Sequence, residues 1–176
     1  LVKTKSITWW RISLISLKTG MRLNEILSLT WSDLDLSARV IHVRFSKKKV
    51  RMTPMPLSIK ALFEEMPPDL PSALIFPSTT GDKSEQVSMS FKRAVEELGF
   101  NKGIKDARQK VVFHTLRQTF ASGLAIDGVP LYTISEFMGH STSDMTKRYA
   151  HLCPDTKTAA VGKIDAISQE GRSLTS

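Results

Sequence analysis

The stretch at residues 138–151, MGHSTSDMTKRYAH, decides how this sequence is interpreted, because it places a Gly-His pair nine residues before a tyrosine. The chain contains only two tyrosines, Tyr132 and Tyr149. A phenol in water has a pKa of about 10, so it acts as a nucleophile at neutral pH only when cations or a base help it. The stretch therefore singles out Tyr149 together with His140, and we interpret Tyr132 as a core or interface aromatic.

Two upstream segments hold further candidates. The segment HTLR at 114–117 places His114 and Arg117 three residues apart, hence on one face of a helix. The segment TGMRLNE at 19–25 places Arg22 after a glycine turn and three residues before Glu25. Taken singly, such arginines are most often in surface salt bridges, and such histidines are most often satisfied helix-associated imidazoles. An arginine fork can also hold two oxygens of a phosphate without ever losing its proton.

Composition narrows the class of protein. The chain has 176 residues, 41% of them hydrophobic, which fits one globular domain with a real core. Lysine and arginine number 25 against 17 aspartate and glutamate, a formal charge of +8, so nucleic acid is the first partner to consider. A single cysteine, Cys153, excludes an internal disulfide, and no apolar run approaches the roughly 20 residues of a membrane span. We expect a cytoplasmic protein without a membrane partner.

Periodicity predicts a mainly helical α+β domain with a small three-stranded antiparallel sheet. Apolar residues recur at helical spacing before the glycine at position 20, and strand-forming residues fill 39–45 and 50–57. We expect a third short strand at 74–76. The expected helices are 7–19, 23–29, 59–66, 87–98, 114–126, 131–138 and 142–149, with a further one from 154 to about 163.

The turn between the first two predicted strands is strongly basic. Lys47, Lys48 and Lys49 follow one another there, and Arg51 comes shortly afterwards. Such a run is usually a solvated surface that contacts phosphates without specificity. We assign DNA-phosphate contacts to Lys48, Lys49 and Arg51.

The three segments occur in the same order as in the tyrosine recombinase (phage integrase) family, and the chain resembles the catalytic domain of that family from about Ile12 to about Leu152. Thr115 and Gln118 stand where the family frequently has aspartate and histidine, which puts local packing in doubt more than activity. The resemblance implies the DNA breaking-rejoining fold over residues 1–163 and a polar tail at 164–176. It also implies that an N-terminal DNA-binding domain is absent from this chain.

The resemblance also implies a role for each candidate residue. Tyr149 would attack a phosphodiester to give a 3′-phosphotyrosine and a free 5′-hydroxyl, and a second 5′-hydroxyl would reverse the step. Arg22, Arg117 and His140 would bind the phosphate, His114 would transfer protons, and Glu25 would support Arg22. A lysine on the hairpin would protonate the leaving oxygen, and its spacing to Arg51 favours Lys47. Strand exchange would occur in a tetramer on duplex DNA, and this chemistry requires no cofactor and no metal.

Three rival functions share part of this pattern. A type IB topoisomerase uses the same tyrosyl chemistry but rejoins the same strand; the short spacing from the Gly-His pair to the tyrosine favours a recombinase. A DNA-binding regulator without activity would not need the tyrosine, both arginines and both histidines together. A basic scaffold protein would have no reason to hold them.

Overall fold

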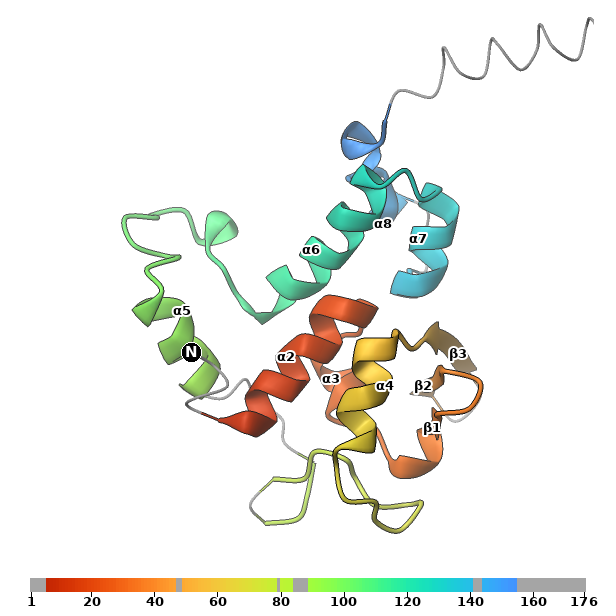
Figure 1. Cartoon of the computed structure of the whole chain (residues 1–176). Helices are drawn as coiled ribbons and strands as arrows, with labels where there is room; N and C mark the ends of the chain where they lie inside the picture. The colour runs from red at the N-terminus through yellow and green to blue at the C-terminus, as the bar shows by residue number, and fades with distance from the viewer. Residues whose placement is uncertain (1–5, 47–48, 79, 84–88, 141–143, 155–176) are drawn as a thin grey trace, which may run out of the picture.

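Helix α2 (Ile7–Thr19) passes through the centre of the structure, a computed structural model that describes residues 6–46, 49–78, 80–83, 89–140 and 144–154 (Figure 1). Ser6 caps its N-terminus by accepting a hydrogen bond from the Trp9 backbone N–H at 3.4 Å. Gly20 ends it in the left-handed conformation, with φ of 67°, as the glycine signal predicts. Its buried residues Ile12 and Ile15 face the core.

The sheet has three antiparallel strands in the order β1 (Leu34–Asp35), β2 (Val40–Ser46) and β3 (Lys49–Pro54). The β2–β3 hairpin confirms the predicted one, and Ser46 pairs with Lys49 at its end. Lys47 and Lys48, which join these two positions, lie outside the described residues.

The prediction of a third strand at 74–76 is wrong. Leu74 makes only an isolated bridge to Thr30, and the third strand is β1, at residues 34–35, where no strand is predicted. The carboxylate of Asp33 accepts hydrogen bonds from the backbone N–H and the hydroxyl of Thr30, at 2.9 and 2.8 Å. This cap closes a single 3-10 turn, η1 (Trp31–Asp33), after which the chain can pair with β2.

The remaining helices lie where the apolar periodicity predicts them, but the one expected at 23–29 ends at Ile26 and the one expected at 59–66 spans 57–64. They are α3 (Leu23–Ile26), α4 (Leu57–Glu64), α5 (Met89–Glu97), α6 (Phe113–Ile126), α7 (Leu131–Met138) and α8 (Asp144–Lys147), with 3-10 turns η2 (Ala107–Gln109) and η3 (Ala150–Leu152). The predicted helix at 142–149 is shorter than expected: it ends at Lys147, and Tyr149 caps η3 instead. The predicted last helix and the polar tail at 164–176 lie outside the described part of the chain.

Two clusters of buried hydrophobic residues form the core of the described part of the chain. The larger one joins α2, α4 and the sheet through residues such as Ile15, Ile41 and Phe63, and the smaller one joins α6 and α7 around Ile134 and Met138. Figure 1 shows α6 above α2 and beside α7 and α8. In the described residues, no helix has both the length and the apolar character needed to cross a membrane.

Candidate active site

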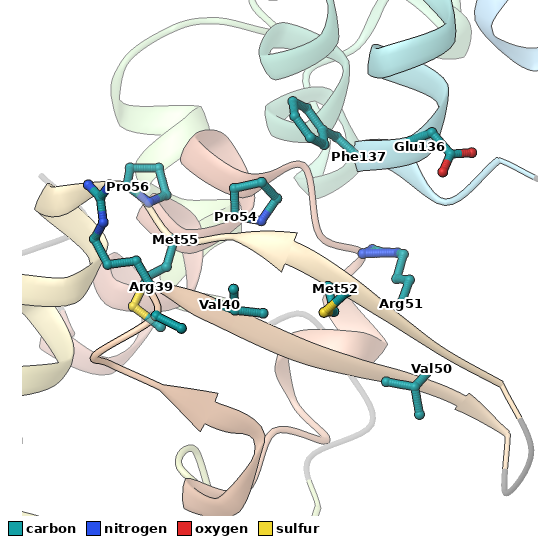
Figure 2. Close-up of a pocket in the computed structure, with 11 residues that line it drawn as sticks. Arg39, Val40, Val50, Arg51, Met52, Pro54, Met55, Pro56, Glu136 and Phe137 are labelled. Atoms are coloured by element: carbon teal, nitrogen blue, oxygen red, sulfur yellow. The ribbon is translucent and has the colours of Figure 1, made fainter.

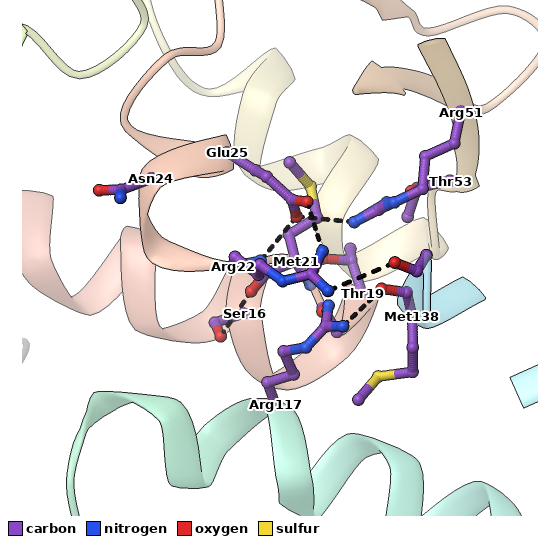
Figure 3. A network of polar contacts seen from close by, with 12 residues as sticks. Ser16, Thr19, Met21, Arg22, Asn24, Glu25, Arg51, Thr53, Arg117 and Met138 are labelled. Carbon is purple, nitrogen blue, oxygen red and sulfur yellow. Dashed lines mark hydrogen bonds and ion pairs between the residues drawn. The ribbon is translucent and has the colours of Figure 1, made fainter. Parts of the chain in front are cut away.

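Arg117 joins the two halves of the molecule. It lies on α6, is 1% exposed, and donates hydrogen bonds to the carbonyl oxygens of Gly20 and Met138 (Figure 3). Gly20 ends α2 and Met138 ends α7, so one guanidinium connects three helices. Burial, followed by repulsion from Arg22, lowers the pKa of Arg117 to about 10, so the group stays protonated at neutral pH.

Arg22 lies beside Arg117 at the start of α3. Its Nη2 donates to the Gly139 carbonyl oxygen at 3.3 Å, one residue beyond the carbonyl that Arg117 contacts. Arg22 and Arg117, far apart in sequence, therefore converge on the end of α7. This convergence places two guanidinium groups together, as the resemblance implies.

Glu25 holds Arg22 from the opposite side. Its Oε1 accepts from Arg22 Nη1 at 3.0 Å, and its Oε2 accepts from the Arg22 backbone N–H at 2.7 Å. The same Oε2 accepts from Arg51 Nη2 at 2.6 Å, and Arg51 Nη1 donates to Thr53 Oγ1 at 2.6 Å. Glu25 is thus shared between an arginine of α3 and an arginine of β3, as Figure 3 shows.

The two histidines lie close to this arginine pair, because Arg117 and Arg22 act on the pKa of each. His140 follows the end of α7, and its Nδ1 is 2.7 Å from Thr146 Oγ1 of α8. Burial, then the charges of Arg117 and Arg22, lower the pKa of His140 to about 4. His114 lies in the first turn of α6 and is only partly covered; this partial burial, then the charges of the same two arginines, lower its pKa as well. Both imidazoles are therefore neutral at pH 7 in the free protein.

Tyr149 is 5% exposed and packs in the smaller hydrophobic cluster, against residues that include Ala125 and Ile134. Burial raises the pKa of its phenol, while Arg148 and Arg117 act in the opposite direction. The thiol of Cys153 donates to its backbone carbonyl, with the sulfur 3.8 Å from the oxygen. In the free protein the phenol is therefore protonated and shielded from solvent.

The structure brings together five of the predicted site residues: Arg22, Arg117, His114, His140 and Tyr149, with Glu25 behind them. Sequence reasoning missed Thr146, which orients His140, and Arg148, whose charge acts on Tyr149 and on both histidines. The position of Arg148 directly before the tyrosine was the signal that could have found it.

The structure describes only some of the predicted site residues on the β2–β3 hairpin. Lys47 and Lys48 lie outside the described residues, and Lys49 is the first residue of β3. The side chain of Arg51 is 11% exposed and turned toward Glu25, so its predicted DNA-phosphate contact has no exposed guanidinium to support it. Tyr132, predicted as a core or interface aromatic, is exposed on α7 and so is not a core residue.

A groove of about 830 Å³ lies beside this site, between the hairpin and α7 (Figure 2). Its walls are mostly apolar, from Val40, Val50 and Met52 on the sheet to Phe137 on α7. Neither the histidines nor Tyr149 line it. The described residues also include no group of three or more His, Cys, Asp and Glu side chains that could hold a metal ion.

Comparison with known proteins gives a family and a fold. Residues 3–155 match the phage integrase family. The integrase of Haemophilus phage HP1 is 32% identical over 149 residues, covering 84% of this chain and 38% of that protein. The tyrosine recombinase XerD of Rhizobium meliloti is 32% identical over 141 residues, covering 76% and 44%. The chain thus spans less than half the length of these curated relatives.

Solved structures agree on the fold. The catalytic domain of bacteriophage HP1 integrase superposes with a TM-score of 0.62 at 28% identity, covering 90% of this chain and 82% of that one. The XerA recombinase gives a TM-score of 0.62 at 26% identity, covering 93% and 60%. The Tn1549 transposon integrase, in complex with circular intermediate DNA, gives 0.67 at 23% identity, covering 90% and 59%. The predicted α+β fold with its small antiparallel sheet is therefore confirmed.

Proposed function

The chain belongs to the phage integrase family, and from this premise we propose that it is the catalytic domain of a site-specific DNA recombinase with Tyr149 as its nucleophile. The convergence of Arg22 and Arg117 beside His140 and Tyr149 is the observation that carries the proposal. These four residues come from three separate segments of the chain. A fold that only had to be stable would gain little from placing a second guanidinium, that of the half-buried Arg22, beside the buried Arg117.

The arginine pair fits a phosphodiester in its transition state. Negative charge grows on the non-bridging oxygens during attack, and preorganised cationic donors lower its energy. Arg22 and Arg117 supply two such forks. His140 adds an N–H donor: if Thr146 Oγ1 donates to Nδ1, the neutral ring carries its proton on Nε2.

The nucleophilic step begins with a protonated phenol. The Tyr149 oxygen forms a bond to phosphorus, and its proton passes to His114, whose lowered pKa keeps it in the neutral, proton-accepting form at pH 7. The bond from phosphorus to the 5′-oxygen breaks, and that oxygen takes a proton from the general acid. A hairpin lysine is the proposed acid, with Lys47 the favoured residue. Reversal with another strand's 5′-hydroxyl completes recombination.

Access to the phosphate requires a movement of the Tyr149 segment. Tyr149 is 5% exposed and Arg117 is 1% exposed, so neither reaches a DNA phosphate in this conformation. The charge of Arg117 acts on the pKa of Tyr149, so the two groups are close to each other. Displacement of η3 would therefore present the nucleophile close to Arg117.

The proposed partner is duplex DNA. The net charge of +8 favours a polyanion. Among the structural relatives, the Tn1549 integrase and the XerH recombinase were solved with DNA bound. We also propose that the active form is a tetramer on two synapsed sites, because exchanging two duplexes requires four strand cleavages.

The test is covalent trapping. The chain is incubated with a pool of random-sequence duplexes, each nicked so that cleavage releases a short fragment, and protein joined to DNA is isolated under denaturing conditions. The proposal expects an adduct at one recovered sequence and none with Tyr149→Phe, which removes a single oxygen. An adduct of undiminished yield in Tyr149→Phe would refute the assignment of Tyr149.

The trapped adduct also separates recombinase from topoisomerase. When an excess of a second strand with a 5′-hydroxyl is added, a recombinase joins it to the trapped strand. Rejoining of the original strand alone, together with relaxation of supercoiled DNA, would identify a type IB topoisomerase.

A further inference from the structure

We propose that Arg51 is a positioning residue that acts through Glu25, connecting the β2–β3 hairpin to the phosphate-binding Arg22. This inference rests on the proposed function, and it differs from the expectation that Arg51 contacts DNA phosphates. The relevant contacts all lie within the described residues, on α3 and β3.

The first argument is where the guanidinium of Arg51 lies. It is 11% exposed, and its two terminal nitrogens contact Glu25 Oε2 and Thr53 Oγ1, each at 2.6 Å. Thr53 is itself buried. A residue that gripped the DNA backbone would present its fork to solvent, whereas this fork is turned inward. Figure 3 shows it approaching Glu25 from the side of the sheet.

The second argument is that Glu25 needs both arginines. Its side chain is 8% exposed, and a buried carboxylate is stable only when paired and hydrogen-bonded. Glu25 uses Oε1 for Arg22 Nη1, and Oε2 for the Arg22 backbone and for Arg51. Without Arg51, Oε2 loses its charged partner, and the carboxylate would pull the Arg22 side chain out of its present position.

The third argument concerns net charge. One carboxylate alone beside Arg22 would neutralise it and weaken its attraction for a phosphate. With Arg51 on the other side, the trio of Arg22, Glu25 and Arg51 carries a net positive charge. Burial is the main cause that lowers the pKa of Arg117 and of Arg51, and repulsion adds to it, from Arg22 and Arg51 on Arg117 and from Arg22 on Arg51. Glu25 thus fixes Arg22 without cancelling its charge.

The fourth argument is the place of Arg51 in the chain. It lies on β3 just after the hairpin turn that carries the proposed general acid, and it contacts the helix that begins at the phosphate-binding arginine. The contact from Arg51 to Glu25 therefore fixes the hairpin relative to the phosphate. A misplacement of about 1 Å at a reacting centre can reduce a rate by about 10²-fold.

The test compares Arg51→Gln with Arg44→Gln on the recovered DNA site. Arg44 is a matched control because it lies on the paired strand β2 and makes one ion pair, to Asp33 at 2.7 Å, but its side chain is 61% exposed. We expect Arg51→Gln to slow adduct formation by about 10²-fold while the Kd for DNA changes less than about threefold and its salt dependence is unchanged. Arg44→Gln should affect rate less than about threefold.

A double substitution distinguishes action through Glu25 from direct contact. If Arg51 acts through Glu25, then Arg51→Gln costs little more once Glu25→Gln is present, so the two losses do not multiply. Multiplying losses, or a weaker Kd with a smaller salt slope in Arg51→Gln, would show a direct phosphate contact and overturn the proposal.

Two further variants keep the result interpretable. Thr53→Val removes only the second acceptor of the Arg51 fork, and an intermediate loss of about 5- to 10-fold is expected from a loosened guanidinium. Thermal unfolding of each variant confirms that it is folded at the assay temperature. If Arg51→Gln fails to fold, an unimpaired rate in Thr53→Val overturns the proposal.

The wild-type adduct is measured in the same series. Its absence would contradict the proposed function, and the role of Arg51 would fall with it. A normal wild-type adduct with an unimpaired Arg51→Gln would contradict the role of Arg51 alone.

Discussion

Substitution of Gly20 by alanine tests the packing of the end of α2 against α6. Gly20 has a φ of +67°, and a Cβ at this position would lie 2.6 Å and 2.8 Å from Cδ1 and Cε1 of Phe120. The left-handed conformation costs a non-glycine residue about 1–2 kcal/mol. Overpacking against the Phe120 ring adds about 1–3 kcal/mol. Gly20→Ala should therefore lower the free energy of unfolding by about 3 kcal/mol.

The measurement is thermal unfolding followed by circular dichroism. For a chain of this size, about 1 kcal/mol corresponds to roughly 2–4 °C, so Gly20→Ala should lower Tm by about 6–12 °C. Gly99→Ala is the control, because Gly99 has a similar φ of +70° but no atom within 4 Å of the point that a Cβ would occupy. It should lower Tm by only about 2–8 °C.

A second substitution isolates the contact with Phe120. Phe120→Leu removes the ring atoms that the new Cβ would meet, so it should recover part of the Tm loss in the Gly20→Ala background. Equal losses of Tm in Gly20→Ala and Gly99→Ala, or no recovery with Phe120→Leu, would refute the packing argument.

Three further predictions concern chemistry. The pKa of His140 is about 4 in the folded chain and near 6.5 in the unfolded chain, so between these pH values only the unfolded state binds the proton. The free energy of unfolding should therefore fall by about 1–2 kcal/mol, after allowance for partial exposure, as the pH drops from 7 to 4. Urea unfolding at each pH should show a smaller fall in His140→Gln, and an equal fall would contradict the pKa shift. Adduct formation should proceed undiminished in excess EDTA, because Arg22 and Arg117 supply the charge that a metal would otherwise provide; strict dependence on a divalent ion would refute this. Lys47→Ala should lose about 10²-fold in cleavage rate and regain most of it when sulfur replaces the bridging 5′-oxygen, whereas rescue in Lys49→Ala alone would move the general acid along the hairpin.

The C-terminal ends of α2 and α7 could be predicted from the sequence because local chemistry sets them. Gly20 and Gly139 both adopt the left-handed conformation at the ends of α2 and α7, as their positions after apolar repeats indicate. The third strand could not be found in this way. It has only two residues, and it forms because Asp33 caps the turn before it. The segment 31–36 has no apolar periodicity that would indicate this turn or the strand.

The candidate site could be predicted as a set of residues but not as an arrangement. Motifs name Arg22, Arg117, His140 and Tyr149, yet nothing in the sequence says that Tyr149 is buried, because its burial depends on the packing of α6 against α7. The inward orientation of Arg51 escapes the sequence for a related reason. A basic residue near a lysine run looks like surface, and only the fold brings Glu25 of another element within 2.6 Å of it.

The contacts of Arg22 and Arg117 with the end of α7 have a thermodynamic consequence. The last carbonyl groups of a helix carry a partial negative charge, equivalent to about half an elementary charge. The carbonyl oxygens of Met138 and Gly139 accept hydrogen bonds from the two guanidinium groups. The free protein therefore already places a partial negative charge beside both arginines. This partial negative charge reduces the repulsion between the two guanidinium groups in the absence of DNA. A phosphate that binds there replaces the partial negative charge of the carbonyl groups with a full negative charge. The repulsion between the two arginines is already overcome when the chain folds, so it does not weaken the binding of DNA.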